Sequence, residues 1–188
     1  MNGATRRAVF LDRDGVINEN RSDYVKSWDE FVFLPGVFAP LEQLAQTEFA
    51  VVVITNQSII NRGILPQAEV EAINRRMLQA IERQGGRIDA VLFCPHRPDE
   101  ACDCRKPRTG LLHQAATRFN LDLERSFLIG DATSDMQTAV NAGCRPVMVR
   151  TGRGESQAGL LPPRLAAQCH VVANLDEAVA WILAQLAL

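Results

Sequence analysis

The chain has 188 residues, of which 47% are hydrophobic and 22% charged, which is typical of one soluble globular domain. Its formal net charge is −2, so charge gives no reason to expect nucleic acid or an anionic membrane as a partner. No apolar run is long enough for a signal peptide or a membrane span, and five cysteines are an odd number, so we expect a cytoplasmic protein with reduced thiols. We also expect a single domain over residues 1–188 and a monomer.

Short β-branched and apolar runs alternate with helical patterns along the chain. The runs predict strands over residues 8–11, 50–54, 88–93, 127–129, 147–149 and 170–172. Helical patterns between them predict helices from Pro40 to about Thr47 and over residues 70–81, 133–142 and 175–186. Strands that alternate with helices form βαβ units, so the sequence predicts an α/β fold: a three-layer, doubly wound (Rossmann-like) parallel sheet.

Polar residues follow four of these predicted strands, at the edge where ligands bind in such sheets. In chain order they are Asp12 and Asp14, then Thr55, then Lys106, then Asp131 and Asp135. Carboxylates suit Mg²⁺, a lysine and a hydroxyl can hold phosphoryl oxygens, and one carboxylate can attack phosphorus. Each short pattern alone is common in turns and helix caps. Four of them in this order predict a Mg²⁺-dependent site that transfers a phosphoryl group.

Four motifs carry a resemblance to the haloacid-dehalogenase (HAD) superfamily: FLDRDGV, ITNQS, RKP and IGDATSD. The chain is most similar to the branch of heptose-bisphosphate and histidinol-phosphate phosphatases, through LDRDGVIN, TNQS, CPH…CxCRKP and the VRTG stretch that ends at Gly152. The motifs lie too close together for an inserted large cap domain. The resemblance therefore implies a HAD fold without such a cap and with a zinc-binding loop.

The resemblance also implies the chemical roles of the four acidic residues. Asp12 would be the nucleophile and a Mg²⁺ ligand, and Asp14 the general acid and base. The backbone carbonyl of Asp14 would bind the metal as well. Asp131 would be a further Mg²⁺ ligand, with Asp135 in support.

The substrate is expected to be a small phosphorylated metabolite whose phosphoryl group Thr55 and Lys106 hold. Heptose 1,7-bisphosphate, hydrolysed at its 7-phosphate, is the first candidate and histidinol phosphate the alternative; an inactive zinc-stabilised binding module is a remote one. The chain departs from the family pattern at Ile59 and Ala132, which bears on the substrate and leaves the catalytic set intact. The expected substrate contacts are Asn18, Tyr24, Asn56, Gln57, Ser58, Arg62 and Arg105.

Three cysteines and one histidine lie within eleven residues, directly before the predicted phosphate-binding segment. Cys94 and His96 are two residues apart, as are Cys102 and Cys104, and three thiolates with one imidazole suit tetrahedral Zn²⁺. Four protein ligands leave no open position, so the sequence predicts a structural zinc; a loop with free thiols is the alternative. Such a zinc would fix the backbone just before Lys106 and so preorganise phosphate binding.

Overall fold

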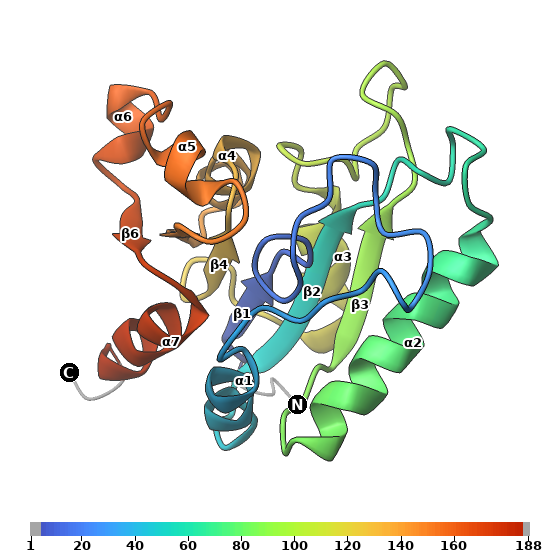
Figure 1. Ribbon diagram of the computed structural model, residues 1–188. Helices are drawn as coiled ribbons and strands as arrows, with labels where there is room; N and C mark the ends of the chain where they lie inside the picture. The colour runs from blue at the N-terminus through green and yellow to red at the C-terminus, as the bar shows by residue number, and fades with distance from the viewer. Residues whose placement is uncertain (1–4, 186–188) are drawn as a thin grey trace.

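The computed structural model describes residues 5–185, and one sheet of six parallel strands lies at its centre (Figure 1). The strands lie in the order β3-β2-β1-β4-β5-β6, which confirms the predicted doubly wound parallel sheet. Each predicted strand is present, with ends that differ by at most two residues. Their bounds are β1 (Ala8–Leu11), β2 (Ala50–Asn56), β3 (Ala90–Cys94), β4 (Phe127–Gly130), β5 (Arg145–Val149) and β6 (His170–Val172).

Helices cover both faces of the sheet, which makes the three predicted layers (Figure 1). One face packs against α1 (Phe38–Ala45), α2 (Gln67–Arg83) and α7 (Leu175–Ala184). The other packs against α3 (Gly110–Phe119) and α4 (Thr133–Asn141), with the short α5 (Gly154–Ala158) and α6 (Pro163–Ala166) beside them. The predicted helices are confirmed, although Leu186 at the predicted end of the last one lies outside the described residues. The two short helices have too few turns to give a periodic signal.

The strands are apolar at successive positions because both faces of the sheet are buried. Val9 and Leu11 of β1 contribute to the core under α1, α2 and α7, whereas Phe10 contributes to the core on the opposite face. On α2 the predicted stripe faces the sheet, and Met77 at its centre is fully buried. Among residues 5–185, no helix is long and apolar enough to cross a membrane.

The strand order reverses between β1 and β4, which is the topological switch point where such sheets bind ligands. Two long segments without a helix or strand, residues 12–37 and 95–109, follow β1 and β3 on this edge (Figure 1). Aromatic contacts hold the first segment, since Phe31 stacks on Trp28 at 5.2 Å and meets Phe33 edge-on at 5.1 Å. The fold therefore brings two long loops to the carboxyl ends of the strands.

Candidate active site and metal centres

Asp12 follows β1 directly and continues its pairing with β4. Its backbone N–H donates to the Ile129 carbonyl at 2.9 Å, one step beyond the register that pairs Leu11 with Ile129. The side chain is only 5% exposed, and its Oδ1 accepts the Arg13 N–H at 2.7 Å. Strand pairing therefore fixes Asp12 beside Asp131, which directly follows β4.

Asp131 is fully buried, in a space that two glycines leave open. Gly15 (φ +88°) and Gly152 (φ +58°) approach it so closely that a Cβ on either residue would overlap its carboxylate. Oδ2 accepts the Arg153 N–H at 2.8 Å, but the buried Oδ1 has no hydrogen-bond partner. Burial raises the pKa of Asp131, and the charge of Asp12 adds to the effect. An unpaired buried carboxylate oxygen of this kind is suited to a cation.

Lys106 supplies the positive charge in this centre. It is 4% exposed, and its Nζ lies 2.9 Å from Asp12 Oδ2 and 2.7 Å from Asp135 Oδ1. Nζ also donates to the Ile54 carbonyl at 3.1 Å. Burial alone would lower the pKa of Lys106, but the two carboxylates raise it above its ordinary value, so the ammonium stays charged.

Asp12, Asp131 and Asp135 form one group, here called the carboxylate centre. Each has a carboxylate oxygen within 4.8 Å of those of the other two, and all three residues are buried. Burial raises the pKa of Asp12 to about 6, although Lys106 opposes the shift. Lys106 and the exposed Arg153, whose Nε lies 3.7 Å from Asp131 Oδ2, leave the three carboxylates under-compensated, and the all-oxygen donor set fits Mg²⁺. The side chain of Asp14 is not in this group.

Asp14 lies on the cavity side of the site, held by four hydrogen bonds. Nη2 of Arg13 donates to both carboxylate oxygens at 3.0 Å, Asn18 donates to Oδ1 at 2.9 Å, and Gln57 donates to Oδ2 at 2.9 Å. Burial would raise the pKa of Asp14, but the Arg13 charge and the hydrogen-bond donors lower it. Asn18, a predicted substrate contact, is fully buried behind this carboxylate, so its geometry favours support of Asp14 over contact with a substrate.

Residues at the end of β2 connect Asp14 on one side of the site with Lys106 on the other. Thr55 is buried, and Gln57 donates from one amide nitrogen to Thr55 Oγ1 at 3.0 Å and to Asp14. Asn56 pairs with the backbone of Lys106: its Nδ2 donates to the Lys106 carbonyl at 3.3 Å, and its Oδ1 accepts the Lys106 N–H at 3.1 Å. The residues at the end of β2 therefore fix both the Asp14 side chain and the Lys106 backbone in the protein without a ligand.

A cavity of about 430 Å³ opens beside these residues. Asp131, Asp135 and Asn18 are not among its lining residues; they lie behind the wall. Ile59, one of the departures from the family pattern, is likewise fully buried. The predicted residues that do line the cavity are Asp12, Asp14, Tyr24, Thr55, Asn56, Gln57, Ser58, Arg62, Arg105 and Lys106.

Sequence reasoning missed several lining residues, among them Ser134 and Arg153. Arg153 follows the VRTG stretch after β5, so the strand-end rule applied to one more strand would have found it. Arg21, which also lines the cavity, lies in the loop after β1 between the predicted contacts Asn18 and Tyr24. Tyr24 in the same loop was predicted, and its hydroxyl lies 3.3 Å from Ser58 Oγ, which joins the two walls of the cavity.

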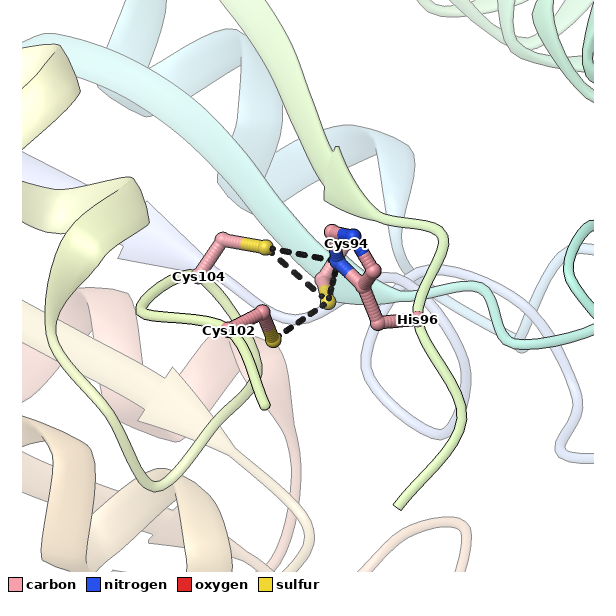
Figure 2. A group of neighbouring side chains, drawn as sticks. All are labelled: Cys94, His96, Cys102 and Cys104. Carbon is pink, nitrogen blue, oxygen red and sulfur yellow. Dashed lines mark hydrogen bonds between the residues drawn. The ribbon is translucent and has the colours of Figure 1, made fainter. Parts of the chain in front are cut away.

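The four predicted zinc ligands converge, as Figure 2 shows, and are called the thiol–imidazole cluster below. Cys94 ends β3, and its Sγ lies 3.8 Å from Cys102 Sγ, 3.1 Å from Cys104 Sγ and 3.5 Å from His96 Nδ1. A tetrahedral Zn²⁺ with Zn–S of about 2.3 Å and Zn–N of about 2.0 Å separates two sulfurs by roughly 3.8 Å and a sulfur and a nitrogen by roughly 3.5 Å. The separations of Cys94 from Cys102 and from His96 match these values, and Cys104 lies closer to Cys94 than a bound ion would place it. The donor set is the one that zinc prefers.

Hydrogen bonds of Arg105 and Glu100 hold the loop that carries this cluster next to the active site. Lys106 follows Cys104 by two residues, and Arg105 between them donates to the His96 carbonyl at 3.0 Å. Glu100 accepts the Arg97 N–H at 2.5 Å and the Asn61 side-chain amide at 3.0 Å. Arg105 thus spans the cluster and the cavity wall.

The sequence matches a family model described as HAD-hydrolase-like over residues 103–178. The D-glycero-β-D-manno-heptose-1,7-bisphosphate 7-phosphatase of Pseudomonas putida is 42% identical over 149 residues, which is 79% of this chain and 85% of the relative. The enzyme of that name from Bordetella bronchiseptica is 41% identical over 174 residues, covering 91% of this chain and 96% of the relative.

Solved structures give the same result. The crystal structure of D,D-heptose 1,7-bisphosphate phosphatase from B. bronchiseptica, complexed with magnesium and phosphate, matches with a TM-score of 0.88 and 37% identity over 95% of this chain and 99% of that one. The Burkholderia thailandensis enzyme matches with a TM-score of 0.70 and 33% identity over 96% of this chain and 99% of that one. The predicted resemblance is confirmed: the chain belongs to the family of heptose-1,7-bisphosphate 7-phosphatases among the HAD-like hydrolases.

Proposed function

We propose that this chain is a Mg²⁺-dependent phosphatase that removes the 7-phosphate of D-glycero-β-D-manno-heptose 1,7-bisphosphate through an aspartyl phosphate. The observation that carries the proposal is the buried contact of Asp12 with Lys106 at the switch point, 2.9 Å apart and open to the cavity on one side. The relatives support the substrate, since they bear the name of this activity over most of the chain.

In the proposed first step, a carboxylate oxygen of Asp12 attacks phosphorus and the bond from phosphorus to the ester oxygen breaks. Asp14, in its protonated form, gives its proton to that oxygen and so releases the sugar alcohol. In the second step water attacks the aspartyl phosphate, Asp14 takes one of its protons, and the phosphorus–Asp12 bond breaks. Asp12 and Asp14 thereby return to their initial states, with inorganic phosphate as the product.

Asp12, Asp131 and the backbone carbonyl of Asp14 would hold Mg²⁺, with Asp135 in support. Bound there, the metal neutralises charge on the carboxylates and on the phosphoryl oxygens. Lys106 holds the phosphoryl group from the other side, aligned by the Ile54 carbonyl and Asp135. Thr55 adds a hydroxyl at the end of β2.

The cavity wall explains why a bisphosphate suits this site. Arg21, Arg62, Arg105 and Arg153 line it in addition to the buried Lys106. One phosphate at Asp12 uses Lys106, which leaves guanidinium groups for a second phosphate, and these bind phosphate with paired N–H donors. The described loops leave the cavity open, so side chains on its rim, rather than closure of a large cap, would set the specificity.

We further propose that the thiol–imidazole cluster binds one structural Zn²⁺. Three sulfurs and one imidazole nitrogen complete a tetrahedral shell, which leaves no position for a reacting water. Its contribution to function is indirect, through the backbone of the segment that presents Arg105 and Lys106.

Phosphate release from heptose 1,7-bisphosphate, measured with Mg²⁺ and with EDTA, tests the proposal. We expect a higher kcat/KM for this substrate than for histidinol phosphate, and no activity without the metal. Asp12→Asn should reduce turnover by at least about 10³-fold, because an amide is not a nucleophile. A wild-type protein that hydrolyses neither substrate with Mg²⁺, or an Asp12→Asn protein with near wild-type activity, would overturn it.

A further inference from the structure

The one feature of the site that the proposed chemistry does not use is the arginine between the two catalytic aspartates. Arg13 is 1% exposed, among the largest fully buried side chains of the described protein. Its Nε is buried without a hydrogen-bond partner. A buried charge with an unsatisfied donor is costly, so its position requires an explanation in terms of what the guanidinium does.

The guanidinium connects Asp14 to the helical layer behind the site. Nη2 contacts both Asp14 oxygens at 3.0 Å, while Nη1 donates to Asn74 Oδ1 of α2 at 3.0 Å. The face of the Phe31 ring lies 5.8 Å from the guanidinium carbon. Asn74 is itself buried. The arginine is thus fixed on three sides, by an amide, an aromatic ring and the carboxylate.

The Asp14 carboxylate has no other charged partner in the described structure, since Asn18 and Gln57 are neutral amides. Its side chain is 23% exposed, enough to face the cavity and enough to rotate into solvent if released. An acid–base group must stay within hydrogen-bond reach of the ester oxygen and later of the water. The amides of Asn18 and Gln57 alone would neither balance the negative charge of Asp14 nor hold its side chain in one rotamer.

We infer that Arg13 is the positioning residue of Asp14: supported by Asn74 and Phe31, it holds the carboxylate in the one rotamer from which it exchanges a proton with the ester oxygen and with water. This inference rests on the proposed phosphatase function. Arg13 also lines the cavity, but both of its terminal nitrogens are engaged, Nη2 by Asp14 and Nη1 by Asn74, so its contribution is to position Asp14. A lysine could not replace it fully, because one ammonium cannot bridge Asp14 and Asn74 with the planar fork of a guanidinium.

Two esters with different leaving groups separate this role from a merely structural one. The sugar alcohol needs a proton to leave, whereas 4-nitrophenolate leaves without one, and hydrolysis of the aspartyl phosphate needs a base with either ester. In Arg13→Met, kcat for the sugar bisphosphate should fall by about 10²-fold with KM changed less than threefold. With 4-nitrophenyl phosphate, stopped-flow traces should show a burst that approaches one nitrophenolate per enzyme before a slow steady state.

Arg76→Met is the matched control. Arg76 lies on the exposed side of α2, over Trp28 at 5.3 Å, and has no contact with Asp14, so its variant should keep wild-type kcat and show no new burst. Arg13→Lys should fall between wild type and Arg13→Met. Asn74→Leu, which removes only the rear support of Arg13, should show the same burst with a loss of a few-fold.

Equal losses on both esters with no burst would overturn the inference. If Arg13→Met does not fold, Asn74→Leu decides by the same criterion: a burst at unchanged KM supports the role, and a uniform loss refutes it. Failure of the underlying function looks different, since the wild-type protein would then hydrolyse neither ester with Mg²⁺.

Discussion

The carboxylate centre and the thiol–imidazole cluster both bring together metal-ligand residues at the same edge of the sheet, but the fold holds them by different means. Asp12 and Asp131 directly follow β1 and β4, the two central strands, and all three carboxylates are buried. In the cluster only Cys94 belongs to a strand, at the edge of the sheet. The other three ligands lie in residues 95–109, which contain no helix or strand.

The difference in support suggests different roles for the two metal sites, one in the reaction and one in the structure. The pairing of β1 with β4 positions Asp12 and Asp131, so the Mg²⁺ that we propose there would serve the reaction. The loop around the cluster has no strand pairing, so the zinc that we propose there would serve the position of the backbone. Lys106 belongs to both: its side chain reaches the carboxylate centre, and its backbone follows Cys104 by two residues. Variants that change activity and stability to different extents test whether the two sites have these different roles.

The largest effect is expected from Asp131→Asn. Removal of this carboxylate should reduce kcat/KM by at least about 10³-fold, because Mg²⁺ loses a ligand. The same change removes a buried charge with an unpaired oxygen, so the unfolding midpoint with EDTA should stay the same or rise. Activity assays and thermal melts check both parts. Asp176→Asn, on an exposed residue of α7, is the control. A clear drop in the melting temperature would mean that this centre also holds the fold.

Lys106→Met should show the next largest effect, now on stability. Two buried carboxylates would lose their common ammonium, which costs about 3–5 kcal/mol in comparable buried pairs. Added Mg²⁺ should restore part of this loss, since it supplies positive charge beside Asp12. Urea titrations with and without Mg²⁺ measure it. Lys26→Met is a close control, because Lys26 is the only other lysine and forms ion pairs at the surface. Equal stability of both variants would contradict the account.

Removal of the cluster's metal should affect binding more than chemistry. In Cys102→Ser, or after chelation of zinc, we expect KM to rise by roughly tenfold with kcat lowered less, because Lys106 and Arg105 lose their fixed backbone. Trypsin should then cut after Arg105, whose side chain donates to the His96 carbonyl in the folded loop. Elemental analysis should find about one zinc in the wild-type protein, and Cys169→Ser should retain it. An intact loop and an unchanged KM after complete removal of zinc would refute the coupling.

The smallest effect is expected from Asn56→Leu. Its amide makes two hydrogen bonds with the Lys106 backbone, so the change should cost about 2 kcal/mol of stability and raise KM by roughly threefold. Asn61→Leu, which removes only a contact with the partly exposed Glu100, should change KM less than twofold. If Asn56 contacts the substrate instead, kcat/KM should fall well beyond this range while stability is retained.

The sheet, and the position of the proposed catalytic residues at one edge of it, could be predicted because both follow from simple regularities. Alternation of strands and helices fixes a parallel sheet, and a parallel sheet gathers the residues after its strands at one edge. Asp12, Thr55 and Asp131 could therefore be identified before the structure was known. The four cluster residues were predicted from their spacing and ligand chemistry, and the structure brings them within reach of one ion.

The other contacts of the site depend on how the loops fold against the sheet, and the loop sequences have no periodic pattern that predicts this. Asn18 was predicted as a substrate contact, yet it is buried and holds Asp14, and Asn56 lines the cavity but also holds the Lys106 backbone. Arg13 reads as a spacer between two aspartates, and only the packing of Phe31 and α2 shows it to be buried. Arg21 lies on the cavity because an aromatic cluster fixes the loop after β1.

The arginines of the cavity wall also have a consequence for how fast a substrate arrives. The molecule as a whole carries a net charge of −2, yet Arg21, Arg62, Arg105 and Arg153 surround the mouth of the cavity. Clustered guanidinium groups around a concave site raise the local positive potential and draw in phosphate dianions that the average surface would repel. The second-order rate constant should then fall as salt is added, with a steepness that depends on these four side chains rather than on the net charge.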